Sequence, residues 1–96
     1  MAKQELKLAT SYEKKELDQP VTLSDGTVVT MSCINDGGKK SISGEAVKNE
    51  KQVGNMRLSP DSGRLYMQVQ PLSEVSTSVA LEIVETFMAG ISLFTK

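Results

Sequence analysis

The most restrictive feature of the sequence is the segment GNMRLSPDSGRLYMQVQP, residues 54–71, which predicts a β-hairpin. Its centre, PDSG, has the composition of a turn: Pro60 presets the φ angle that a turn requires, and Gly63 tolerates the positive φ at which other residues are strained. Apolar and polar residues alternate on both sides of this loop, as expected for strands that each bury one face. The sequence therefore predicts two antiparallel strands joined at residues 60–63.

The length of this loop determines which residues of the two predicted strands face each other. It places Leu58 opposite Leu65 and Met56 opposite Met67, so one face of the hairpin is apolar. The other face carries the polar or amphipathic residues Arg57, Tyr66, Gln68 and Gln70. An apolar sheet face has to be covered by a second layer of the domain.

A second hairpin is predicted in PVTLSDGTVVTMSCI, residues 20–34. A two-residue Asp-Gly turn and a three-residue Ser-Asp-Gly loop, with Gly26 in the left-handed bulge position, give different registers. The three-residue loop separates the two faces better, with Val28 as an exception on the outer side. It directs five residues inward, namely Val21, Leu23, Val29, Met31 and Cys33.

The segments beside these hairpins give weaker signals. Residues 5–12, ELKLATSY, alternate in polarity and favour a first strand, with a short helix as the alternative, before the charged linker EKKELDQ. Residues 35–55 are rich in Gly, Lys, Asn and Ser and lack a sustained period, so we expect a loop that binds a partner or is partly disordered. Within this loop, GEAVKNEKQ fits two turns of helix and ISGEAV fits an edge strand.

The last third of the chain predicts an amphipathic helix over residues 74–89, with Ser73 as its N-cap and Gly90 as its stop. Seven apolar residues recur at helical spacing, namely Val75, Val79, Ala80, Ile83, Val84, Phe87 and Met88. The hexapeptide ISLFTK, residues 91–96, then lies beyond the helix. We expect its apolar side chains to form an added strand, wrap the domain edge or contact another chain.

Together these elements predict an α+β fold made of two layers. Four to five mainly antiparallel strands, arranged as two hairpins, are covered on one face by the long C-terminal helix. At 96 residues the chain has room for a single small domain, residues 1–96.

Composition excludes several functional classes. The sequence contains no histidine, which rules out Ser-His-Asp and Cys-His nucleophile systems and His-ligated metals. Cys33 is the only cysteine, so there is no intrachain disulfide or Cys-based metal site, and we expect a cytoplasmic location. The net charge of −1 comes without a basic cluster, which argues against nucleic-acid binding. Glu82 and Glu85 interrupt the helix and make its polar face acidic, which argues against a membrane role.

No catalytic or cofactor-binding constellation emerges from the residues that remain. Gly37 to Ser41 resembles part of a phosphate-binding loop, but Cys33 stands where the first glycine of that motif is required, so the segment is interpreted as a solvated turn. We therefore expect no enzyme and no cofactor. The partner-binding candidates are Lys39, Lys40, Arg57, Tyr66, Gln68, Ile91, Leu93 and Phe94.

These residues favour a non-enzymatic protein-protein interaction factor, such as an adaptor, an inhibitor, a chaperone or an immunity-type small protein. Its partner would be another protein or a second copy of the chain. The alternative is a structural subunit of a larger homo- or hetero-oligomeric assembly, to which the C-terminal hexapeptide would add a strand.

Overall fold

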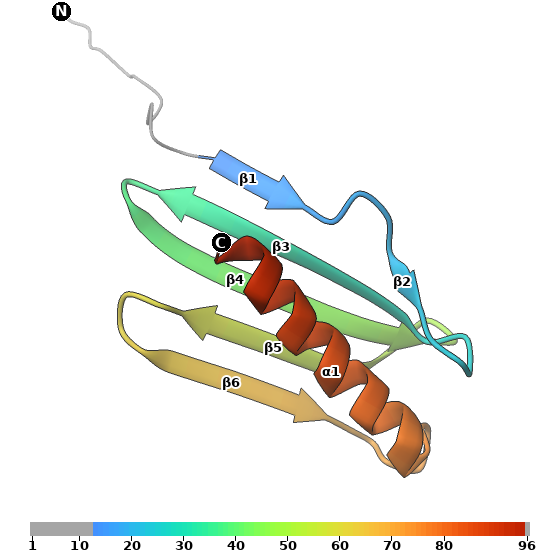
Figure 1. Cartoon of the computed structure of the whole chain (residues 1–96). Coiled ribbons are helices and arrows are strands. Elements are labelled where there is room, and N and C mark those ends of the chain that lie inside the picture. Colours follow the sequence, from blue (N-terminus) through green and yellow to red (C-terminus); the bar gives the residue numbers. More distant parts are fainter. Residues whose placement is uncertain (1–12, 96) are drawn as a thin grey trace, which may run out of the picture.

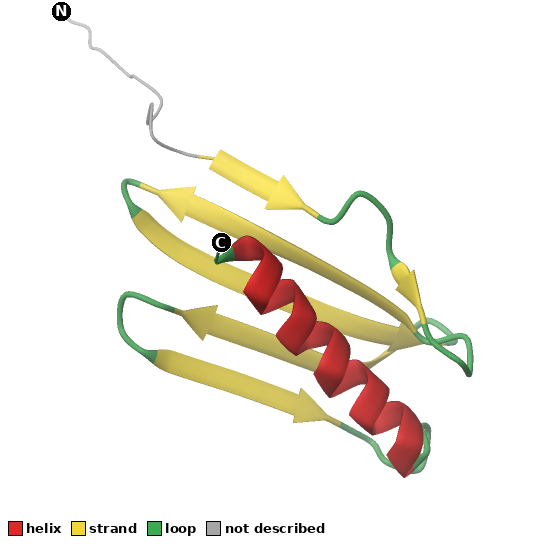
Figure 2. Cartoon of the chain, in the orientation of Figure 1, coloured by secondary structure: helices red, strands yellow, loops and turns green. Residues whose placement is uncertain are grey.

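The computed structural model describes residues 13–95 and shows an antiparallel sheet with one helix packed on it (Figures 1 and 2). The order across the sheet is β1-β3-β4-β5-β6, and β2 pairs with β3 beside β1. The α+β architecture expected from the sequence is confirmed. The elements are β1 (Glu13–Glu16), β2 (Val21–Thr22), β3 (Val28–Asp36), β4 (Lys39–Lys48), β5 (Lys51–Ser59), β6 (Arg64–Val69) and α1 (Thr77–Phe94).

Both predicted hairpin registers are confirmed. Leu58 faces Leu65 and Arg57 faces Tyr66 across β5 and β6. In the first hairpin Val21 faces Val29, as the three-residue loop with Gly26 at φ 91° requires. Val21 nevertheless stays exposed, because β2 lies at the edge of the sheet beyond the cover of α1.

The loop expected over residues 35–55 is wrong, because these residues form β4 and most of β5. Two tight turns make this possible: Gly37-Gly38 and Asn49-Glu50 all adopt positive φ, the geometry of two-residue hairpin turns. The alternation of apolar and polar residues is weak over residues 39–48, because the inward positions include Gly44 and Ala46, which contribute little hydropathy. Strand β4 is therefore the centre of the sheet, rather than an edge strand or a helix.

The charged linker expected after residue 12 is also wrong in part, because its first four residues form β1. All four side chains of EKKE are exposed, and the strand is held by backbone pairing with Ser32–Asn35 of β3. An edge strand needs no apolar side chains, and charged ones discourage further pairing. The strand expected over residues 5–12 lies outside the described residues.

Helix α1 begins and ends later than predicted. Its N-cap is Ser76, whose side chain accepts a hydrogen bond from the Val79 N–H at 3.3 Å. The helix continues through Gly90, which is buried against the sheet rather than serving as the stop. A Cβ at position 90 would overlap Met31 Sδ and lie 2.6 Å from Met31 Cε, so glycine here permits close packing. Met88, expected to be buried, is 58% exposed.

The core lies between α1 and the centre of the sheet. Phe87 and Ile83 are fully buried and point to two glycines of the sheet. A Cβ on Gly44 would lie 3.0 Å from Phe87 Cε1 and 2.9 Å from Met31 Cγ, closer than ordinary contacts. Because Gly44 has no side chain, the Phe87 ring packs directly against the backbone of β4 at this position. The remaining buried apolar residues are Val29, Met31, Cys33, Ile42, Ala46, Val53, Met56, Val75 and Val79.

Polar contacts hold the first half of α1 on the sheet. Lys48 Nζ lies 3.0 Å from Asp25 Oδ2 and donates to the Glu74 carbonyl at 2.8 Å, which joins the β2–β3 loop, β4 and the segment before the helix. The Ser24 hydroxyl donates to Glu82 Oε2 at 2.7 Å. Hydrogen bonds from Thr27, and then the Lys48 ammonium, lower the pKa of Asp25 to about 2 from its ordinary 3.8.

Substituting Gly44 with alanine should destabilise the fold. The new Cβ forces Phe87 or Met31 to move, and overpacking of this kind costs about 1–3 kcal/mol, more than alanine gains in backbone entropy. Chemical denaturation measures the change in the free energy of unfolding. Phe87→Leu should absorb part of the cost, so the double variant should lose less than the sum of the two single losses. Additive losses would show that the two positions are not in contact.

The Asp25→Asn variant should lose stability only where the wild-type carboxylate is ionised. The folded-state pKa lies below the unfolded value, so this contribution is present above pH 3.8 and is lost as pH falls toward about 2. Asparagine can still accept the hydrogen bond from the Thr27 N–H. We expect the variant to melt below wild type at about pH 7 and together with it at about pH 2. A melting difference that is constant over this range would contradict the assignment.

Candidate functional site: the open face of the sheet

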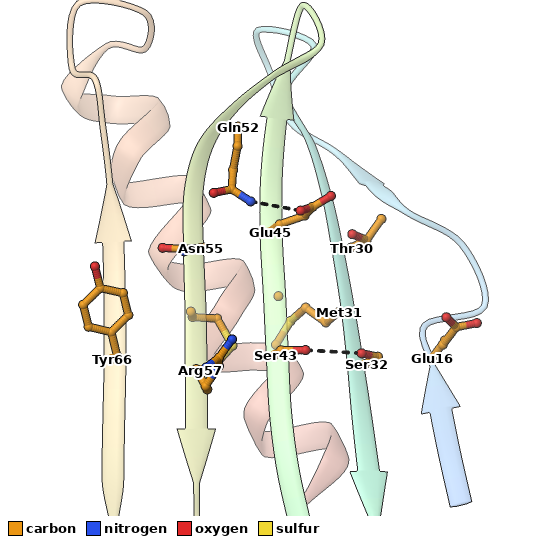
Figure 3. A pocket seen from close by; sticks show the side chains of 12 residues that line it. Glu16, Thr30, Met31, Ser32, Ser43, Glu45, Gln52, Asn55, Arg57 and Tyr66 are labelled. Atoms are coloured by element: carbon orange, nitrogen blue, oxygen red, sulfur yellow. Dashed lines mark hydrogen bonds between the residues drawn. The ribbon is translucent and has the colours of Figure 1, made fainter.

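The sheet face opposite α1 is the candidate site. No described element covers it, and five strands contribute the residues that line it (Figure 3). These residues enclose an open depression of about 600 Å³. They are Glu16, Thr30, Met31, Ser32, Ser43, Gly44, Glu45, Gln52, Asn55, Met56, Arg57 and Tyr66. The face is therefore a shallow, polar surface rather than an enclosed cavity.

Arg57 lies on β5, next to the edge of the sheet, between Ser43 of β4 and Tyr66 of β6, which it opposes in the sheet register. Its side chain is exposed. Within residues 13–95 the Arg57 guanidinium forms neither an ion pair nor a side-chain hydrogen bond. None of its donors is thus used by residues 13–95, and a guanidinium can bind a carboxylate or a carbonyl.

Tyr66 and Gln68 extend the face along β6. The Tyr66 ring is 52% exposed, and its hydroxyl donates a hydrogen bond to Gln68 Oε1. Because the two residues are two apart on one strand, both side chains lie on the same side of the sheet. This contact keeps the aromatic ring on the open face, beside Arg57 (Figure 3).

The other half of the depression is uncharged or acidic. Gln52 Nε2 donates to Glu45 Oε1 at 3.0 Å, and the Ser32 and Ser43 hydroxyls lie 3.4 Å apart (Figure 3). Glu16 lies 3.4 Å from Lys14 on β1. The lining of the depression therefore carries two negative charges, Glu16 and Glu45, beside the positive charge of Arg57, which suits hydrogen bonding to a polar partner surface and gives no extended basic patch.

The structure brings three of the predicted partner-binding residues together on this face, namely Arg57, Tyr66 and Gln68. Lys39 and Lys40 are exposed at the β3–β4 turn, at one end of the sheet. The Lys40 N–H donates to Asp61 Oδ2 at 3.0 Å, so this turn contacts the β5–β6 loop. Both lysine side chains are therefore outside the depression itself.

The expected placement of the C-terminal hexapeptide beyond the helix is wrong, because residues 91–94 are the last turn of α1 rather than an extended tail, whereas its contact with another chain stays a prediction. Ile91 and Phe94 are half-buried and pack against the core. Leu93 is 55% exposed, so it alone of the three remains available to a partner. Continuation of the helix through Gly90 explains the difference, since its close contact with Met31 favours glycine without ending the helix.

Helix α1 is also long and apolar enough to cross a membrane by length and composition, with a mean hydropathy of 1.4 over 18 residues, of which 22% are buried. Glu82 and Glu85 therefore do not exclude a membrane span by themselves. The core helix of a soluble protein can pass the same test, and here the buried side of α1 packs on the sheet.

Sequence reasoning missed the β4 part of the site, including Ser43 and Glu45, together with Gln52 at the start of β5. These residues lie in the segment expected to be a loop. The Asp36-Gly37-Gly38-Lys39 sequence was the available signal, because consecutive glycines between two strands favour a two-residue hairpin turn. Comparison of the chain with protein-family models, curated proteins and solved structures finds no match.

Proposed function

We propose that this chain is a non-enzymatic protein-binding factor, of the adaptor, inhibitor, chaperone or immunity type, which binds its partner through the open face of the sheet. One observation carries the proposal: Arg57 presents an exposed guanidinium, unpaired within the described residues, in the lining of a polar depression. A charged group in this position contributes little to the fold, because the sheet register is maintained by backbone pairing.

The chemistry of the face indicates a partner of acidic or carbonyl-rich character. A guanidinium binds a carboxylate through two parallel hydrogen bonds, and arginine and tyrosine are enriched among residues that dominate binding energy. Tyr66 lies directly opposite Arg57 and supplies an amphipathic ring. Lys39, at the end of the sheet and on the same side of β4 as Ser43, adds positive charge at the rim, whereas Lys40 shares the other side with Ile42.

The location and the classes of partner are part of this proposal. Cys33 is reduced and buried, which is compatible with a reducing cytoplasm. Glu16 and Glu45 offset Arg57 in the lining of the depression, so the depression lacks the positive field on which nucleic-acid affinity depends. We expect no membrane partner for this face, because its side chains are polar.

Substitution of Arg57 with alanine should abolish partner capture. The wild-type chain and the variant would be immobilised separately and exposed to extract of the cells that produce the protein, with bound proteins identified by mass spectrometry. Loss of a binding hot spot of 2 kcal/mol or more weakens the affinity for the captured partner about 30-fold. Lys15→Ala is the matched control, since it removes one exposed positive charge from the opposite side of the sheet.

Equal capture by wild type and Arg57→Ala would contradict the proposal, provided that both melt at the same temperature. Loss of capture by Lys15→Ala as well would indicate that net charge, rather than the open face, determines binding.

A structural subunit of a larger assembly is the alternative, and the free edges of the sheet favour it. Strands β1 and β6 are the two end strands, and each has one side unpaired among the described elements. Light scattering after size-exclusion chromatography distinguishes the candidates. Growth of the particle mass with concentration beyond a dimer favours the assembly, whereas a mass that does not exceed that of a dimer at any concentration favours the binding factor.

A further inference from the structure

The outer edge of β6 is a site for backbone pairing. The Gln70 N–H donates a hydrogen bond to the Val53 carbonyl at 2.8 Å, so the backbone of residue 70 bonds toward β5. In an antiparallel ladder every second residue bonds to the same neighbouring strand, so residues 64, 66 and 68 also bond toward β5. The backbone groups of Leu65, Met67 and Val69 therefore point away from the sheet, where no described strand pairs with them (Figure 1).

This edge lacks the devices that usually block pairing with another chain. Its sequence, RLYMQV, contains no proline or lysine, and its register with β5 runs without a bulge. By contrast, the opposite edge strand β1 is EKKE, with every side chain charged. The two edges of the sheet thus differ in side-chain charge: the charged side chains of β1 discourage the addition of a further strand, and the mostly uncharged side chains of β6 permit it.

A protruding side chain and a groove lie at the two ends of this strand. Leu65 belongs to the helix-facing side of the sheet, yet it is 57% exposed because α1 crosses the other end of β6 (Figure 1). At that other end, an apolar groove of about 260 Å³ separates β6 from α1. Its walls include Met67, Val69, Thr77, Ala80, Leu81 and Val84.

We propose that a second copy of this chain binds at the β6 edge, with the two β6 strands antiparallel about a two-fold axis that passes beside Met67. This register pairs Leu65 with the partner's Val69 and Met67 with the partner's Met67. Residues 65, 67 and 69 of each copy then exchange two backbone hydrogen bonds with their opposite residue, so every free group of the edge is paired. The inference stands apart from the proposed function, which uses Arg57 on the open face.

The same register inserts Leu65 of each copy at the groove of the other. Leu65 faces the partner's Val69, which is part of the groove wall, and the two-fold axis repeats the contact in the opposite direction. Leu81 and Met88 are seven residues apart on one side of α1, and both are more than half exposed. They extend this apolar surface along the helix.

The charges along the edge fit a second copy. Arg64 is the only charged residue of β6, and the proposed register places it opposite the partner's Gln70 rather than the partner's Arg64. On the open face, Tyr66 lies opposite the partner's Gln68. No like charges therefore meet along the joined strands, a condition that strand pairing requires.

Other occupants of the edge fit less well. Strand β1, where the described part of the chain begins, is at the opposite end of the strand order from β6. A lipid surface would satisfy the apolar side chains but would leave the backbone groups of three residues without partners, which is costly in an apolar medium. A second copy of the chain covers the apolar side chains and also supplies hydrogen-bond partners for the backbone groups.

Multi-angle light scattering of the full chain tests the proposal. We expect a dimer that dissociates on dilution, and Leu65→Glu should be a monomer at the concentrations where wild type is a dimer. Leu93→Glu, the same change at a leucine of matched exposure on the last turn of α1, should remain a dimer. The circular dichroism spectra and melting temperatures of the monomeric forms would be compared to confirm that the fold is retained.

A charge exchange separates loss of the interface from loss of folding. Leu81→Lys alone should weaken the dimer, and Leu65→Glu combined with Leu81→Lys should restore it in part, because the new carboxylate of one copy lies near the new ammonium of the other. A wild-type chain that stays monomeric, or a dimer that survives Leu65→Glu, would overturn the proposal. Monomers that float with neutral phosphatidylcholine vesicles would also overturn it and would assign the apolar surface to a membrane instead.

Discussion

The close approach of α1 to the sheet depends on two positions without side chains. Gly44 gives space to the Phe87 ring, and Gly90 gives space to the Met31 side chain, so each layer contributes one glycine and one large residue. A Cβ at either position meets an atom of the opposite layer at a distance that ordinary contacts do not reach. This arrangement determines the line along which α1 crosses the strands. The polar contacts of Lys48 with Asp25 and Glu74 then hold the beginning of the helix on that line.

The position of the helix determines what remains exposed. Because α1 runs diagonally from the end of β6 toward β3 and β4, it covers the centre of the sheet and leaves the hairpin end of β6 bare (Figure 2). Leu65 is exposed for this reason, although the residue pattern places it on the apolar face. A single helix of 18 residues covers only one face of the sheet, so the polar residues of the other face, including Arg57, stay open to solvent.

The parts of the fold that were predictable are those in which two local signals agree. For β5 and β6, the turn residues Pro60 and Gly63 and the two-residue alternation lead to the same register, and the structure has it. In β4 the signals conflict, because Gly44 and Ala46 occupy inward positions for reasons of packing against α1, and this erases the hydrophobic alternation. The end of α1 was misjudged for the same reason, since Gly90 serves a contact with Met31. Gly44, Ala46 and Gly90 are small because of contacts between segments far apart in the sequence, and a local sequence pattern does not show such contacts.

The candidate site shows the same division. Arg57, Tyr66 and Gln68 were found because they lie on the polar side of a hairpin whose register is encoded locally, whereas Ser43 and Glu45 depend on where β4 pairs. The β6 edge is harder to predict from the sequence, because its unpaired backbone groups depend on the order of the strands in the sheet. The open face and the β6 edge nevertheless share one cause, which is the alternation of side chains along β6. Leu65, Met67 and Val69 face the side of α1, which covers them incompletely, whereas Tyr66 and Gln68 face the side that α1 does not cover. Pairing of two β6 strands would bury the first set and would join the two open faces at Tyr66 and Gln68, so a partner bound near Arg57 would lie beside the seam between the copies.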